Sequence, residues 1–222
     1  MSLSLRYRAA LVAGLVLWTA SACGGSGGDA SPTGDASGGS SSSVSASADG
    51  SASGTGAASA TGSPELPVGL STEEQEAALG GLAAYANYLK VGDNVFQGGG
   101  RDPEPLRAVA VGTALTSAQT EAANLAQLNA RLVGSIVAKR IKVTSVNLKT
   151  DPAKSIVPEV VISSCEDSSG VQVVDANGKD ITDSSAAQFF PSTVWARFYP
   201  KNADHAEGWL IARAENSVAG SC

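Results

Sequence analysis

A long low-complexity tract near the start of the chain limits what can fold. Residues 24–63 are almost wholly Gly, Ser, Ala and Thr, with three aspartates and no Lys, Arg or aromatic residue. This composition offers too little apolar surface to offset the entropy lost on folding, so the tract is predicted to be disordered. The remaining residues, 65–222, have the length of one ordinary domain, and a single domain is expected there.

An export signal precedes this tract. Arg6 and Arg8 are followed by a short, almost wholly apolar run and then by small residues at positions 20–22. The run is shorter than the roughly 20 residues that cross a bilayer. Residues 1–22 are therefore predicted to be a cleaved signal peptide rather than a transmembrane helix.

The residues Ala20-Ser21-Ala22-Cys23 resemble the lipobox of bacterial lipoproteins, although Ala20 replaces the usual leucine. The resemblance implies that Cys23 carries fatty acyl chains such as palmitate and that residues 23–64 form a tether. Two acyl chains hold a protein firmly on a membrane. The protein would then be displayed on the extracytoplasmic face of the cell membrane. Ordinary signal peptidase would cut the same bond, so secretion without an anchor is the alternative.

The charges of the chain disfavour nucleic acid as a partner. The formal net charge is −6, and loss of the signal with its two arginines makes the mature chain more acidic. An acidic surface repels phosphate backbones. The one basic cluster, Lys139, Arg140 and Lys142, lies in an alternating stretch and is predicted to be a solvated face.

The sequence contains no motif for a cofactor or a metal. His205 is the only histidine, so a site built from several histidines is excluded. Its small polar neighbours predict a solvated loop position rather than a place in a catalytic triad. The glycine runs at Gly24 and Gly98 lack the Lys and Thr of a phosphate-binding loop and are predicted to be flexible connections.

Cys165 and Cys222 are the cysteines that remain after Cys23. An even pair in an exported domain favours a disulfide, because the outer side of the membrane is oxidising. A redox couple or a metal-ligand pair would need a C-x-x-C spacing or further histidines.

The hydrophobic periodicity changes along the domain from helical to alternating. A capping box at Ser71 and Glu74 opens the first helix, which is expected to end at Gly92. Three helices are expected, at residues 71–92, 102–109 and 117–133. Five strands are expected after them, at residues 137–148, 160–165, 171–174, 193–199 and 209–214. Helices first and an antiparallel sheet second predict an α+β domain.

The stretches VVISSCEDSSGVQVVDANGKDI (160–181) and VWARFYP…EGWLIA (194–212), with this order of elements, resemble the NTF2-like, cystatin-like cone domains of actinobacterial lipoproteins. The resemblance implies helices packed on a curved antiparallel sheet around an interior. Isomerases of this fold place an acid and a tyrosine inside the cone. The residues that could line such a cavity, or form plain core, are Tyr85, Tyr88, Asp93, Trp195 and Tyr199.

Two functional classes remain open. The favoured class is a non-catalytic binding or accessory module that meets a protein, a wall component or a small apolar ligand. The alternative is a small-molecule enzyme of the isomerase or dehydratase kind, which needs an acid with a perturbed pKa in a pocket. Glu166 and Asp167 precede a turn and face opposite sides of a strand, so we expect them to cap that turn rather than to catalyse. No catalytic residue is assigned, and the sequence leaves open whether the domain dimerises through its sheet.

Overall fold

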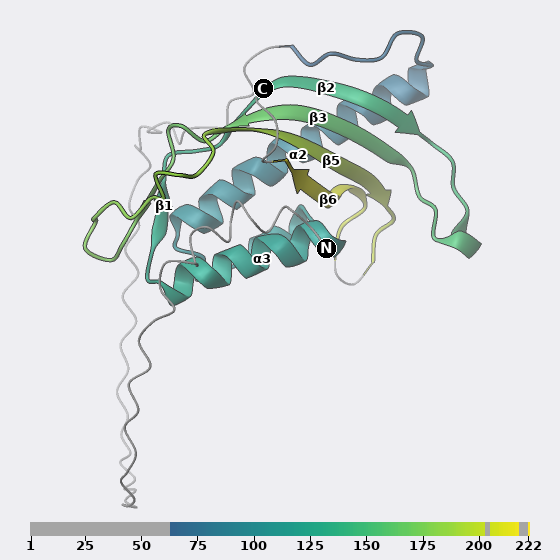
Figure 1. The fold of residues 1–222 in the computed structure, drawn as a ribbon. Helices are drawn as coiled ribbons and strands as arrows, with labels where there is room; N and C mark the ends of the chain where they lie inside the picture. The colour runs from purple at the N-terminus through teal and green to yellow at the C-terminus, as the bar shows by residue number, and fades with distance from the viewer. Residues whose placement is uncertain (1–62, 203–204, 218–221) are drawn as a thin grey trace, which may run out of the picture. The chain divides into compact units, whose positions relative to one another are not determined.

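The computed structural model describes residues 63–202, 205–217 and 222. The predicted signal peptide (1–22), Cys23 and nearly all of the tether (23–64) lie outside the described residues. The described chain begins with helices and continues with antiparallel strands, and both long helices pack on one side of the main sheet (Figure 1). The predicted α+β class is therefore confirmed.

The first described helix is α2, Thr72–Gln97. The predicted capping box is present, since Glu74 N donates to Ser71 Oγ at 3.3 Å and Ser71 N donates to Glu74 Oε2 at 2.9 Å. The helix does not end at Gly92 as predicted. One glycine inside a helix costs only about 1 kcal/mol, and the buried side chains of Val95 and Phe96 continue the apolar stripe past it.

The three glycines that follow α2 form a tight turn rather than a flexible connection. Gly99 and Gly100 are buried and have positive φ angles of 75° and 67°. A Cβ atom at Gly100 would lie 2.0 Å from the carbonyl oxygen of Ala122. Glycine is required here because the chain reverses in direct contact with Ala122 of the following long helix.

The next elements are a 3-10 helix, η1 (Glu104–Ala108), and the helix α3 (Gly112–Gln127). The prediction of a helix over 117–133 was wrong at both ends. Asn129 has a left-handed φ of 49°, a conformation that ends helices. Residues Arg131–Val133 then form a strand, β1, which takes Leu132 out of the predicted helical stripe.

The main sheet is antiparallel, with the strand order β2-β3-β5-β6. Its strands are β2 (Val137–Asn147), β3 (Glu159–Asp167), β5 (Phe189–Tyr199) and β6 (Gly208–Asn216). The short strand β4 (Gln172–Val174) pairs with β1 in a separate two-stranded sheet. All five predicted strands are present, and each lies within a few residues of its predicted position.

The sheet is curved, and each of its two edge strands pairs at one point with another segment. Register shifts interrupt the pairing of β2 with β3 and of β5 with β6, and such bulges bend a strand. Glu65 pairs with the outer edge of β2 near Lys142, and Ala110 pairs with the outer edge of β6 near Ile211. Both edge strands are thereby shielded locally from pairing with other chains.

The core lies between the helices and the concave side of the sheet. Val160 and Ile162 on β3 alternate with outward residues and pack against Ala78 and Tyr85 of α2. α2 approaches closely because it carries glycine at the contact: a Cβ atom at Gly81 would lie 2.9 Å from Cβ of Val160.

The predicted disulfide is present. Cys165 on β3 and Cys222 are bonded through their sulfur atoms, and their Cα atoms lie 5.8 Å apart. Cys165 faces away from the helices, on the side of β3 opposite Ser164 and Glu166. Arg140 of β2 also holds this end of the chain, since its guanidinium donates to the carbonyl oxygen of Cys222.

Candidate functional site

A cavity of about 150 Å³ lies between α3, the β1–β4 pair and the segment that leads into β5. We call it the apolar cavity. Its inner wall consists of the buried side chains of Leu132, Val173 and Phe190. A dry apolar cavity of about 150 Å³ is large enough to bind benzene. The apolar cavity can therefore hold a small apolar group.

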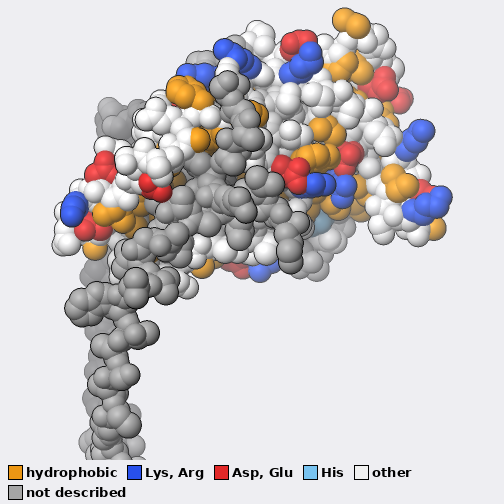
Figure 2. Space-filling model, in the orientation of Figure 1, with side chains coloured by type: hydrophobic (Ala, Val, Ile, Leu, Met, Phe, Trp, Pro, Cys, Tyr) orange, Lys and Arg blue, Asp and Glu red, His pale blue; other side chains and the backbone are white. Residues whose placement is uncertain are grey.

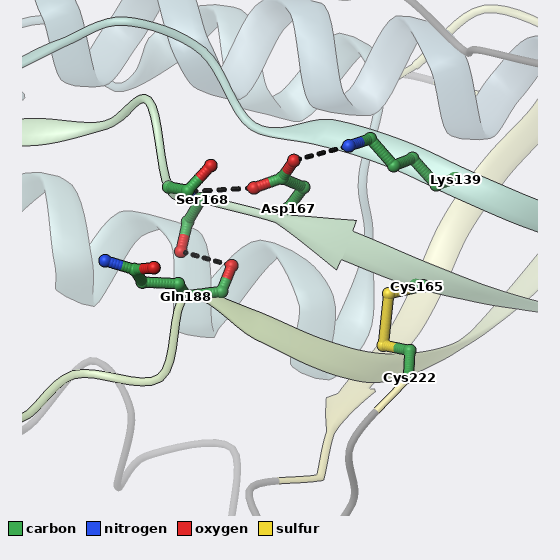
Figure 3. Close-up of polar contacts among 7 residues, drawn as sticks. Lys139, Cys165, Asp167, Ser168, Gln188 and Cys222 are labelled. Atoms are coloured by element: carbon green, nitrogen blue, oxygen red, sulfur yellow. Dashed lines mark hydrogen bonds and ion pairs between the residues drawn. A yellow bond between two sulfur atoms is a disulfide. The ribbon is translucent and has the colours of Figure 1, made fainter.

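The polar part of the cavity lining comes from two segments, the β3–β4 turn and residues 182–188. Ser168 Oγ donates to the carbonyl oxygen of Gln188 at 3.2 Å, which ties the turn to the start of β5 (Figure 3). Thr182 Oγ1 accepts a hydrogen bond from Val173 N at 2.8 Å. These contacts hold the polar side of the cavity in place, because the turn is bonded to residues 182–188 and Thr182 is bonded to β4.

A second, smaller cavity of about 30 Å³ lies between α2, α3 and the sheet. We call it the acidic cavity, because the carboxylates of Asp93 and Glu166 line it among otherwise mainly apolar residues. A cavity of this size admits about one or two water molecules. Ile136 and Asn216 line both cavities, so the two spaces adjoin.

Asp93 lies near the end of α2 and is only 6% exposed. Its Oδ1 accepts a long hydrogen bond of 3.5 Å from Ile136 N. Its Oδ2 is buried and has no hydrogen-bond partner among the described residues. Burial raises the pKa of Asp93 to about 6, and the negative charge of Glu166 acts in the same direction.

Glu166 is also buried, and a tyrosine reaches it from α2. Tyr85 Oη donates to Glu166 Oε1 at 2.7 Å, and it lies 2.7 Å from Ser164 Oγ. Because a phenol has a single proton, which here goes to Glu166, Ser164 must be the donor in the second bond. Burial, followed by the charge of Glu166, raises the pKa of Tyr85 well above its ordinary value.

Of the four aromatic residues that were candidates for lining an interior cavity, two lie inside the fold and two do not. Tyr85 and Tyr88 are buried on the inner side of α2, and Tyr88 lines the acidic cavity. Trp195 lies on the outer side of β5, between the inward-facing Val194 and Ala196, and the guanidinium of Arg213 stacks 4.5 Å from its ring centroid. Tyr199 lies at the end of β5 against His205. Neither Trp195 nor Tyr199 lines the cavities described above.

The prediction that Glu166 and Asp167 both cap a turn was half wrong. Asp167 does cap the turn, because Ser169 N donates to its Oδ1 at 2.9 Å, and it also pairs with Lys139 at 2.6 Å (Figure 3). Glu166 faces the opposite side of β3, where the helices bury it. The alternation of the strand was predicted, but the sequence did not show which face α2 would cover.

The remaining polar candidates lie in loops and on the surface. His205 exchanges contacts with Asn202, including a 2.9 Å hydrogen bond from His205 N to Asn202 Oδ1. Lys142, in the basic cluster, pairs with Glu65. On the face shown in Figure 2, acidic and basic side chains are interspersed, and no broad area of one sign is visible.

The described residues contain neither a metal-binding cluster nor a membrane-spanning helix. Within them, no group of three or more His, Cys, Asp or Glu side chains is arranged to hold a metal ion. In the same part of the chain, no helix combines the length and apolar composition that a membrane span requires.

The apolar cavity had no counterpart in the sequence analysis. Its walls come from α3, the short β1–β4 pair and residues 182–188, a stretch of small polar residues without a recognisable motif. Strand β1 was predicted as part of a helix. No local pattern could therefore place these walls around one space.

Comparisons with known proteins do not assign a family. Neither the protein-family models nor the curated proteins give a match. Among solved structures, a similar chain is the intermembrane space region of the chloroplast protein ARC6, at 18% identity. The similarity covers 63% of this chain and 95% of that chain, with a TM-score of 0.44. A similarity of this size identifies neither a family nor a function.

Proposed function

We propose that this chain is a lipid-anchored extracytoplasmic protein whose NTF2-like domain binds a small, largely apolar ligand in the apolar cavity. The observation that carries the binding function is the 150 Å³ cavity walled by Leu132, Val173 and Phe190. Ligand sites are characteristically concave and mostly apolar, with a few polar groups that orient the ligand. The hydroxyl and amide groups around residues 182–188 are suited to that second task.

The disulfide supports an extracytoplasmic location, because such bonds persist in oxidising compartments. The small-residue sequence before Cys23 supports the anchor. For the NTF2-like fold, the support is the element order, with α2, η1 and α3 followed by a curved antiparallel sheet.

Titration of the purified full chain with benzene, followed by amide NMR, tests the binding function. We expect millimolar benzene to shift the amide signals of Leu132, Val173 and Phe190. Ala186→Phe should abolish these shifts, because it places a ring in the cavity that Ala186 lines. Ala176→Phe is the matched control, since Ala176 is exposed in the preceding turn. Unchanged spectra, or normal binding by Ala186→Phe, would refute a ligand site here.

Mass spectrometry of the mature N-terminus and membrane fractionation test the anchor. We expect acylated Cys23 at the first position and release of Cys23→Ala into the medium. An unmodified Cys23, or a Cys23→Ala protein that stays in the membrane fraction, would contradict it.

One observation favours an isomerase-like enzyme as a second candidate. Asp93 has a pKa of about 6, as a general base at neutral pH requires, and it lines an interior cavity. The 30 Å³ volume of that cavity opposes this candidate, because a whole organic substrate does not fit in it. Deuterium exchange next to the carbonyl of cyclohexanone distinguishes the two. An enzyme would accelerate the exchange and lose the effect in Asp93→Asn, whereas a binding module would show no acceleration.

A further inference from the structure

We infer that the ligand is an organic cation, with an apolar body in the apolar cavity and an ammonium group in the adjoining acidic cavity. The inference rests on the proposed ligand-binding function and adds the charge of the ligand to it. Three observations carry it: the contact between the two cavities, the sign of the charges that line them, and the open oxygen of Asp93.

The two cavities lie side by side. They share Ile136 and Asn216 as lining residues, so an occupant of one lies beside the other. The volumes of the two cavities suit the two parts of such a ligand. About 150 Å³ fits a benzene-sized group, whereas about 30 Å³ fits one or two water-sized groups. An ammonium group is close to water in size.

The ionisable residues that line the two cavities are all acidic. Glu121 and Asp183 line the apolar cavity, and Asp93 and Glu166 line the acidic one. Lys139 on β2 carries a positive charge near this region, but it pairs with Asp167, which lies on the other side of β3. An anionic ligand would meet four carboxylates, so the lining selects against it.

The Oδ2 atom of Asp93 can accept a hydrogen bond from a ligand. Asp93 is 6% exposed, and Ile136 N and the Ser135 side chain donate to its carboxylate, whereas its Oδ2 has no hydrogen-bond partner among the described residues. A buried ionised oxygen without a partner is costly, and a charge-assisted hydrogen bond removes that cost. An ammonium group brings three donors and no acceptor. It can therefore bond to Oδ2 and still face Glu166 or Asn216.

Calorimetric titration of the full chain with benzylamine and benzyl alcohol tests the inference. The two probes have the same number of heavy atoms and differ in charge. At pH 7.5 we expect benzylamine to bind at least about ten-fold more tightly, a difference typical of a buried charged hydrogen bond. Asp93→Asn should remove most of this difference.

The net negative charge of the chain must be separated from the effect of Asp93. Glu73→Gln makes the same change in net charge at an exposed residue in the first turn of α2. It should leave the preference for benzylamine intact. If Glu73→Gln weakens benzylamine binding as much as Asp93→Asn does, bulk charge explains the preference and the inference is wrong.

A pH series gives a second readout. The pKa of Asp93 is about 6, so its ionised fraction falls about ten-fold between pH 7 and pH 5. Benzylamine affinity should fall by a similar factor over this range, and benzyl alcohol affinity should not. Glu121, Asp183 and Glu166 face the same spaces, so the curve of Asp93→Asn is the reference that isolates Asp93.

The outcomes distinguish this inference from the proposed function. Equal or tighter binding of benzyl alcohol would overturn the cationic ligand and leave an apolar binding site standing. Failure of both probes to bind, together with unchanged spectra in benzene, would overturn the binding function and the inference with it.

Discussion

The hydroxyl of Tyr85 on α2 donates a 2.7 Å hydrogen bond to Oε1 of Glu166 on β3, inside the packed interface of helix and sheet. The same hydroxyl receives a hydrogen bond from Ser164. Buried polar groups of this kind stabilise a fold only when they are paired. The bond therefore fixes the position of α2 over the sheet, and with it the position of Asp93 two turns further along the helix.

We predict that Tyr85→Phe lowers the free energy of unfolding by about 1.5–3 kcal/mol, the range for a hydrogen bond to a charged group. Chemical denaturation measures the change. Because Ser164 also loses its partner, a double-mutant cycle with Glu166→Gln is needed to isolate the pair. We expect a coupling energy within the roughly 0.5–3 kcal/mol seen for contacting residues. Additive effects of the two substitutions would show that the two side chains do not interact.

We predict that Asp93 makes the protein less stable as pH rises. Burial raises its pKa in the folded chain from 3.8 to about 6. Between about pH 4 and pH 6, the unfolded chain therefore loses this proton first, and the free energy of unfolding falls by about 3 kcal/mol in total. Above pH 6 the loss is complete, and below pH 4 it is absent.

Asp93→Asn should remove this part of the pH dependence. The difference in the free energy of unfolding between pH 4 and pH 7 should change by about 3 kcal/mol relative to the wild type. Urea denaturation at both pH values measures it. Parallel pH curves for the two proteins would show that Asp93 titrates as an exposed carboxylate does.

The Cys165–Cys222 bond is predicted to stabilise the domain by about 2–5 kcal/mol. The double substitution Cys165→Ser and Cys222→Ser should lower the free energy of unfolding by that amount. Hydrogen exchange should accelerate first in β6, the described strand nearest to Cys222 in the sequence. Equal protection of β6 in the oxidised and substituted proteins would argue against this role.

We predict that Gly81→Ala destabilises the fold and that Gly92→Ala does not. A Cβ atom at Gly81 would lie 2.9 Å from Cβ of Val160, which belongs to the sheet and cannot move aside easily. Overpacking of this kind costs about 1–3 kcal/mol. At Gly92 a Cβ atom would meet only Phe96, at an ordinary 3.5 Å, and alanine favours the helix. Thermal unfolding of both variants gives the comparison, and a stable Gly81→Ala would mean that α2 shifts away from the sheet.

The sequence by itself determined the features that depend on local pattern. The capping box at Ser71 and Glu74 fixed where α2 begins, because both of its hydrogen bonds form within one turn. Alternation placed Glu166 and Asp167 on opposite faces of β3, and the even cysteine count indicated the disulfide. The first two predictions succeeded because neighbours in the chain supply the whole cause, and the third because the domain holds just two cysteines.

Tertiary structure decided which residues meet across the fold. Periodicity could not show that α3 ends at Gln127 and that Leu132 joins β1. The strand β1 forms only by pairing with β4, whose residues are distant in sequence. For the same reason, the sequence could not show that Glu166 is buried against Tyr85. Burial depends on which face of a strand another element covers, and that is settled by long-range packing rather than by the residues beside it. The two cavities are likewise spaces between α2, α3 and separate strands, so no single segment encodes them.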